Sequence, residues 1–148
     1  NSLSQKDLIE ITEMRMILEP LAAVKASTMA SEQEIGEIIK IADKFQKAVD
    51  IGARDAYLKT NRDFHFKIYS GARNQAMIHF IDQLWNMLSP YQYLLSKKSR
   101  SHDFTAGGYK IHQEIIAAFR QGDAESLEYW VKKDITFAFN GIMAEFKE

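Results

Sequence analysis

The amino-acid sequence predicts an all-α protein, and two observations support that prediction. Apolar residues recur mostly at intervals of three and four positions, which is the period of a helix that buries one face. The 148 residues include only seven Gly and two Pro, about half of the usual combined share, so few residues interrupt long helices. We therefore expect an antiparallel bundle of about six helices that forms one domain over residues 1–148.

Start and stop signals divide the chain into the expected helices. Ser31 and Glu34 form a capping box, in which each side chain bonds to the backbone N–H of the other residue. Gly122 ends one helix, and Asp123 caps the next. The expected helices cover residues 4–30, 31–52, 54–71, 74–96, 109–121 and 123 to near the C-terminus.

Three local features bear on the continuity of these helices. Pro20 is expected to kink or divide the first helix, and Pro90 to kink the fourth, because proline lacks an amide hydrogen. The polar, glycine-containing stretch 97–108 is expected to be a loop. The dipeptide Asn140–Gly141 favours a β-hairpin when taken alone, but a helical apolar stripe leads into it, so we expect the last helix to continue.

Charge and composition argue against several classes of protein. The chain has 19 Lys and Arg against 20 Asp and Glu, whereas an autonomous DNA-binding domain normally carries a basic face. No apolar run is long enough to cross a bilayer. Because there is no cysteine, a metal would need His, Asp, Glu or Asn as ligands. We expect a cytoplasmic domain cut from a longer chain, since the first residue is Asn1.

Polar residues interrupt the apolar stripes of three expected helices. Asn61 and His65 lie one turn apart on the third helix, His112 lies in the stripe of the fifth, and Asp134 in that of the sixth. Two imidazoles, a carboxylate and an amide oxygen suit a divalent metal such as Zn, Ni, Mn or Fe(II). Without a metal, Asp134 is expected to pair with His65 or His112 in a buried network, and a single inward histidine is also typical of an ordinary core.

Arg15 is the candidate for contact with an anionic ligand. It lies on the inward stripe of the first expected helix. A guanidinium beside a polar cavity would hold a carboxylate through two parallel hydrogen bonds. The alternative is a salt bridge from Arg15 to Glu19, which follows one helical turn later.

Three segments resemble, in order and spacing, the FCD domain, which is the C-terminal effector-binding domain of FadR-type regulators in the GntR family. They are residues 13–27 (EMRMILEPLAAVKAS), 61–74 (NRDFHFKIYSGARN) and 112–125 (HQEIIAAFRQGDAE). The resemblance covers essentially the whole chain. It implies an all-α bundle of six to seven helices that binds a small carboxylate effector and helps to form a homodimer. It also implies that the bundle follows an N-terminal winged helix-turn-helix domain, absent from this sequence, that contacts DNA.

The resemblance also implies a metal site with an altered set of ligands. Many members of the family hold a metal with one Asp and three His, and the corresponding positions here are Asn61, His65, His112 and Asp134. Asn61 replaces the usual Asp, and Asp134 replaces a usual His. Both replacements are oxygen donors, so two outcomes stay open: loss of the metal, or retention with a changed metal preference. The resemblance gives Arg15 a position that faces the ligand.

We therefore expect the ligand-sensing and dimerisation domain of a bacterial transcriptional regulator, without enzymatic activity. A small organic acid is expected to bind through the divalent metal, and the DNA-binding domain to respond. Phosphate-binding loops, nucleophile elbows and H-E-x-x-H motifs are missing from the sequence. Two alternatives remain: a metal-dependent enzyme with a two-His-one-carboxylate site, and a purely structural helical dimerisation module.

Overall fold

The protein folds into six long helices. The structure is a computed structural model that describes residues 4–98 and 101–146. Every described element is helical, in the order α1 (Gln5–Ser27), α2 (Glu32–Asp50), α3 (Arg54–Ser70), α4 (Gln75–Lys98), α5 (Ser101–Gln121) and α6 (Ala124–Glu145). The predicted all-α fold class is confirmed.

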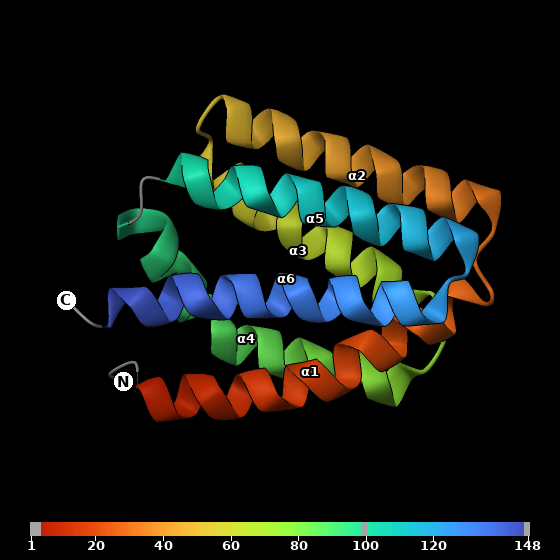
Figure 1. Cartoon of the computed structure of the whole chain (residues 1–148), viewed down its shortest axis with the longest axis horizontal. Coiled ribbons are helices and arrows are strands. Elements are labelled where there is room, and N and C mark those ends of the chain that lie inside the picture. Colours follow the sequence, from red (N-terminus) through yellow and green to blue (C-terminus); the bar gives the residue numbers. More distant parts are fainter. Residues whose placement is uncertain (1–3, 99–100, 147–148) are drawn as a thin grey trace.

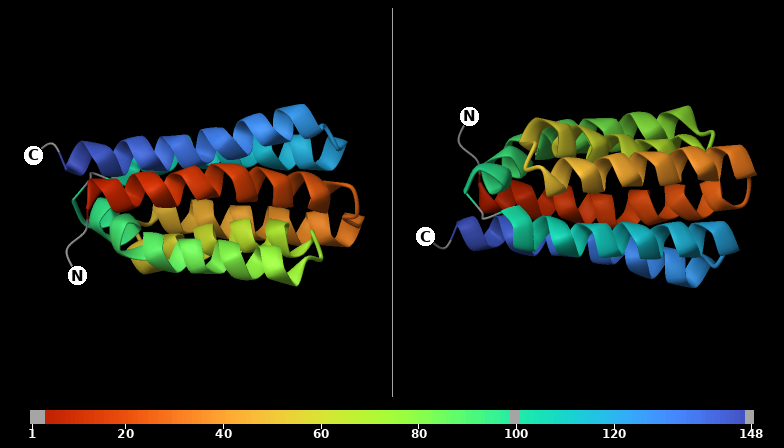
Figure 2. Two further views of the ribbon diagram at one scale, coloured as in Figure 1. Left: turned by 90° about the horizontal axis from the view of Figure 1, so that it is seen from below. Right: turned by 90° about the horizontal axis from the view of Figure 1, so that it is seen from above.

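The helices lie side by side with roughly parallel axes (Figure 1), and contacts between neighbours close into a ring. Around the ring the neighbours follow the order α1, α6, α5, α2, α3, α4 and back to α1, and the two further views show the same arrangement (Figure 2). Consecutive helices run in opposite directions, so α1 and α3 begin, and α4 and α6 end, at one end of the bundle. We call this the terminal end. The prediction of an antiparallel bundle is confirmed.

Side-chain caps define several of the helix boundaries. The Ser31 hydroxyl accepts the N–H of Glu34, whose carboxylate accepts the N–H of Ser31, so the predicted capping box is confirmed. Asp123 caps α6 as predicted, with its carboxylate accepting the N–H of Ser126. These bonds satisfy amide groups that have no partner within the helix.

The start of α1 is also held by a residue from α4. The N–H of Ser4 donates to the Tyr91 hydroxyl at 3.0 Å, and that hydroxyl donates to the carbonyl oxygen of Ser4 at 2.8 Å. One phenol thus binds both backbone groups of the residue that caps α1. The first turn of α1 is consequently fixed to α4 at the terminal end.

The predicted loop over residues 97–108 is wrong. Helix α4 extends to Lys98, and α5 already begins at Ser101. A β-carbon on Gly107 would lie 2.6 Å from the ring of Phe137, and one on Gly108 would lie 3.7 Å from Phe45. These glycines therefore allow close approach of aromatic side chains to α5, which is a role in packing rather than in a turn.

Neither proline ends its helix. Pro20 lies within α1 and Pro90 within α4, so of the two outcomes expected at Pro20, a kink or a division, the division does not occur. Buried surface around Pro20 compensates for the missing hydrogen bond, since packing contributes more to helix stability in proteins than propensity does. Helix α6 continues through Asn140 and Gly141, so the prediction of a helix rather than a hairpin is confirmed.

The apolar core is packed unevenly along the bundle axis. Away from the terminal end, all six helices contribute to one main cluster of buried side chains. Toward the terminal end the core divides into two smaller clusters. The α1/α4/α6 cluster contains Leu8, Ile11, Leu88, Tyr91, Leu95 and Ile142. The α2/α3 cluster contains Phe45, Ala48, Val49 and Tyr57.

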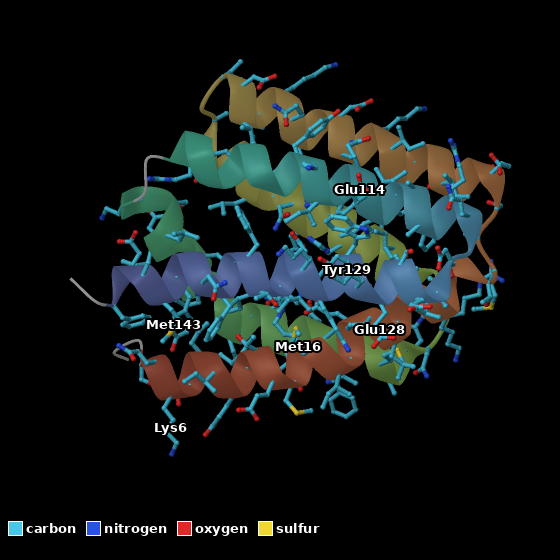
Figure 3. All side chains as sticks on the ribbon, in the orientation of Figure 1. Lys6, Met16, Glu114, Glu128, Tyr129 and Met143 are labelled. Carbon is cyan, nitrogen blue, oxygen red and sulfur yellow. The ribbon has the colours of Figure 1, made fainter. Side chains whose placement is uncertain are left out.

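The outside of the ring carries both charged and apolar side chains. Lys6, at the start of α1, points away from the bundle (Figure 3), and its side chain is 84% exposed. Among the described residues, no helix combines the length and apolar character that crossing a membrane requires.

Two glycine substitutions are expected to change stability in opposite directions. A β-carbon at Gly36, inside α2, would have no atom within 4 Å, so Gly36→Ala is expected to stabilise the protein by about 1 kcal/mol. Gly122 has a φ of +66°, so Gly122→Ala is expected to destabilise it by about 1 to 2 kcal/mol. Urea unfolding of both variants tests this pair, and a shift of the same sign in both would contradict the assigned backbone.

Candidate metal and effector site

A cavity lies inside the ring and receives side chains from all six helices. Its empty volume is about 730 Å³, including the part that opens to solvent. All five residues predicted for the site lie in its lining: Arg15, Asn61, His65, His112 and Asp134. The other lining residues are Phe45, Tyr57, Leu58, Trp85, Gln92, Leu95, Ser96, Gly108, Phe137, Ala138 and Ile142.

Three of the predicted ligands form a compact cluster. One ligand atom from each of His65, His112 and Asp134 lies within 4.8 Å of the other two. They come from α3, α5 and α6, so the cluster joins three helices. Asn61 lies one turn before His65 on α3 and faces the same cavity. Two imidazoles and a carboxylate at this spacing are a donor set that a divalent metal can use.

His65 and Asp134 are in direct contact. The Nε2 atom of His65 lies 2.8 Å from Oδ2 of Asp134, and its Nδ1 atom lies 3.3 Å from the hydroxyl of Tyr69. Burial alone would raise the pKa of Asp134, but His65, His112 and Arg15 together lower it below its ordinary value. Asp134 is therefore a carboxylate at neutral pH. This contact is the buried His–Asp pair that the sequence offered as the alternative to a metal.

His112 is held by aromatic rings rather than by hydrogen bonds. Its ring stacks on Phe64 with a centroid distance of 4.1 Å and lies 4.7 Å from the ring of Phe45. Burial lowers the pKa of His112 to about 3, although Asp134 opposes this shift. The Nδ1 atom is buried and has no hydrogen-bond partner among the described residues. His112 is therefore a neutral imidazole, the form that binds metals.

Arg15 and Glu19 form a buried ion pair beside the cluster. Arg15 donates from Nε and Nη2 to the two carboxylate oxygens of Glu19, at 2.5 and 3.2 Å. Burial alone would lower the pKa of Arg15, but Glu19 raises it above its ordinary value. The salt bridge to Glu19 that the sequence offered as the alternative therefore forms, and Arg15 also borders the cavity. Contact of Arg15 with a ligand stays a prediction.

Two further residues support this ion pair, and the sequence analysis missed them. The Tyr69 hydroxyl donates to Glu19 at 2.7 Å, and Nε1 of Trp85 donates to the same carboxylate at 3.1 Å. Burial and Glu19 raise the pKa of Tyr69 well above its ordinary value, so it stays a donor. Tyr69 follows His65 by one helical turn on α3, and this spacing was the signal that sequence reasoning could have used.

The residues present fit a divalent metal. Asp134 supplies a carboxylate, His112 a neutral imidazole with an unpaired buried nitrogen, and Asn61 a further oxygen within the cavity lining. The Tyr69 hydroxyl beside Nδ1 of His65 is the type of partner that orients a metal-binding histidine. A metal at this cluster would offset the buried negative charge of Asp134.

The chain belongs to the FCD domain family. The model of this domain family matches residues 10–136, which confirms the resemblance found in the sequence. A similar protein is the HTH-type transcriptional regulator McbR of Escherichia coli strain K12, with 24% identity over 130 residues. The match covers 84% of this chain and 56% of McbR, so the chain spans about half the length of that relative.

Solved structures with the same fold include E. coli McbR/YncC and the metal-free FCD domain of TM0439. The first has a TM-score of 0.90 at 20% identity and covers 97% of this chain and 71% of that chain. The second has a TM-score of 0.78 at 15% identity and covers 99% of both chains. Both likenesses extend over the whole six-helix ring, which agrees with the fold described above.

The buried neutral state of His112 predicts a specific pH dependence in chelator-treated protein. The folded pKa of about 3 lies below the ordinary value of 6.5, so the unfolded chain binds this proton first as the pH falls. Below pH 6.5, His112 is therefore expected to cost stability at up to about 1.4 kcal/mol per pH unit. Urea unfolding of wild type and His112→Phe between pH 7 and 5 should show the variant losing less stability. Parallel losses would contradict the assignment.

The Arg15–Glu19 pair predicts non-additive effects of substitution. Glu19→Gln leaves the buried Arg15 charge without a counter-charge and is expected to destabilise the protein by about 3 to 5 kcal/mol. Adding Arg15→Met to Glu19→Gln removes that charge, so the double variant is expected to be more stable than Glu19→Gln alone. Urea unfolding of the single and double variants measures the coupling. Additive losses would show that the ion pair does not act as a unit.

Proposed function

We propose that this chain is the effector-binding domain of a transcriptional regulator, and that it senses a small organic acid at a divalent metal in the bundle core. The observation that carries the proposal is the convergence of His65, His112, Asp134 and Arg15 on one cavity. Membership of the FCD family and similarity to McbR, whose name describes an HTH-type transcriptional regulator, support the same function.

His65, His112 and Asp134 would hold the metal, with Asn61 as a further oxygen donor. A bound divalent ion supplies a Lewis acid that attracts the carboxylate of the effector. Arg15 lies in the same lining and contributes a fixed positive charge. The Arg15 guanidinium is held in place by Glu19 before any ligand arrives, so little side-chain entropy is lost when an anion binds beside it.

Binding would be transmitted as a shift between two arrangements of the helices. The site residues come from α1, α3, α5 and α6, so a ligand that contacts all of them favours one relative placement of these helices. Such coupling between sites amounts to about 1 to 3 kcal/mol in typical cases. The regulator would act as a homodimer, and it would contact DNA through a winged helix-turn-helix domain that precedes this chain in the full-length protein. The net charge of −1 fits a domain that does not itself bind DNA.

A second candidate, a structural module without metal, is favoured by the 2.8 Å contact between His65 and Asp134. This contact satisfies the carboxylate by a protein partner alone. It does not account for the buried, unpaired Nδ1 atom of His112, whose desolvation is costly without a partner. A metalloenzyme has less support, since the cavity lining described here offers no carboxyl or imidazole group beyond the three ligands.

Metal content tests the proposal directly. The purified chain, never exposed to chelator, is expected to contain about one divalent metal ion per molecule by elemental analysis. His65→Ala, His112→Ala and Asp134→Asn are expected to lose it, because each removes one donor of the cluster. Asp134→Asn keeps the size of the side chain and so separates loss of charge from loss of packing.

His79→Ala is the matched control for these variants. His79 lies on the exposed part of α4, outside the cavity lining, so this variant is expected to keep the metal. Circular dichroism checks that every variant is folded. Metal-free wild type that is fully folded and fails to take up Zn, Ni, Mn or Fe would overturn the proposed metal and favour the structural module.

A further inference from the structure

We infer that the acid bound in this cavity is a monocarboxylate with an apolar body, such as a medium-chain aliphatic or phenyl-substituted acid. This inference rests on the proposed function and adds the chemical class of the effector. It follows from the way in which polar and apolar side chains are distributed along the cavity, from the division of the core around it, and from the balance of buried charge.

The charged and metal-binding groups lie at the inner end of the cavity. Arg15, His65, His112 and Asp134 are all near the middle of their helices. From Asp134 the lining continues along α6 through Phe137 to Ile142, which is about 12 Å toward the terminal end at 1.5 Å per residue. The carboxylate therefore belongs at the inner end, and the rest of the ligand extends along the axis toward the terminal end.

The outer part of the cavity has mostly apolar walls. Phe45 and Tyr57 belong to the α2/α3 cluster on one side, and Leu95 and Ile142 belong to the α1/α4/α6 cluster on the other. Protein interiors are normally close-packed, with few voids larger than a water molecule. The cavity therefore lies where the two clusters fail to meet. An apolar ligand body placed there would contact both clusters and complete the core.

Charge balance favours a single carboxylate. A divalent metal and Arg15 bring three positive charges, and the carboxylates of Asp134 and Glu19 bring two negative charges. One carboxylate from the ligand neutralises the one remaining positive charge. A second carboxylate would lie among the apolar walls, where an unpaired charge is very costly. Gln92 and Ser96 also line the cavity, and they can accommodate an uncharged polar substituent on the ligand body.

The test is an isothermal titration calorimetry experiment in which the Zn²⁺-supplemented chain is titrated with acids of increasing length. Acetate, butanoate, hexanoate and phenylacetate are the probes, and hexanedioate is the length-matched control for hexanoate. The affinity is expected to rise about fourfold for each added methylene group, which corresponds to about 0.8 kcal/mol per buried CH₂. Hexanedioate is expected to bind more weakly than hexanoate.

A matched pair of variants tests where the apolar body of the ligand binds in the cavity. Ala138 lines the cavity on α6, so Ala138→Leu narrows the cavity. This variant is expected to lower the affinity for hexanoate about tenfold more than the affinity for acetate. Ala144 lies on the same helix and is exposed, so Ala144→Leu is expected to leave the chain-length dependence unchanged. Equal affinity for acetate and hexanoate, or a chain-length dependence that Ala138→Leu does not alter, overturns the inference while the proposed function stands. Failure of every acid to bind the metal-loaded chain overturns the proposed function itself.

Discussion

The buried ion pair between Arg15 and Glu19 is the interaction on which the rest of the structure depends. The Glu19 carboxylate accepts two hydrogen bonds from Arg15, one from Tyr69 and one from Trp85. These donors belong to α1, α3 and α4, so one carboxylate fixes three helices relative to one another. Because a buried charge without partners costs several kcal/mol, the helices meet where all four bonds can form. The Arg15 side chain is thereby held at the edge of the cavity, beside His65 and Asp134.

This polar centre also explains the uneven core. Beyond it, away from the terminal end, the side chains of six helices pack into one cluster. On the other side, the space between Tyr57 and Leu95 belongs to the cavity, and the apolar residues form two separate groups. The terminal half of the bundle thus has less apolar contact than the other half, because the cavity occupies the space between the two clusters.

Local signals in the sequence were sufficient for most of the fold, and long-range contacts account for the rest. Caps such as Ser31 and Asp123 act within one turn, so they could be recognised without a structure. Helical periodicity likewise placed His65 and His112 on inward faces. The predicted start of α5 was wrong because Gly107 is required by close packing against Phe137 on another helix, and no local sequence rule contains that information. For the same reason, the donors to Glu19 from α3 and α4 became visible only in the folded chain.

The bonds between Tyr91 and Ser4 have a mechanical consequence. Tyr91 lies on α4, next to the cavity residue Gln92. Its hydroxyl forms hydrogen bonds with the N–H and the carbonyl oxygen of Ser4, which precedes α1. Any rotation or slide of α4 that accompanies filling of the cavity therefore moves the first turn of α1 with it. The position of Ser4 and of the first turn of α1 would therefore report the state of a helix whose Tyr91 lies 87 residues further along the chain.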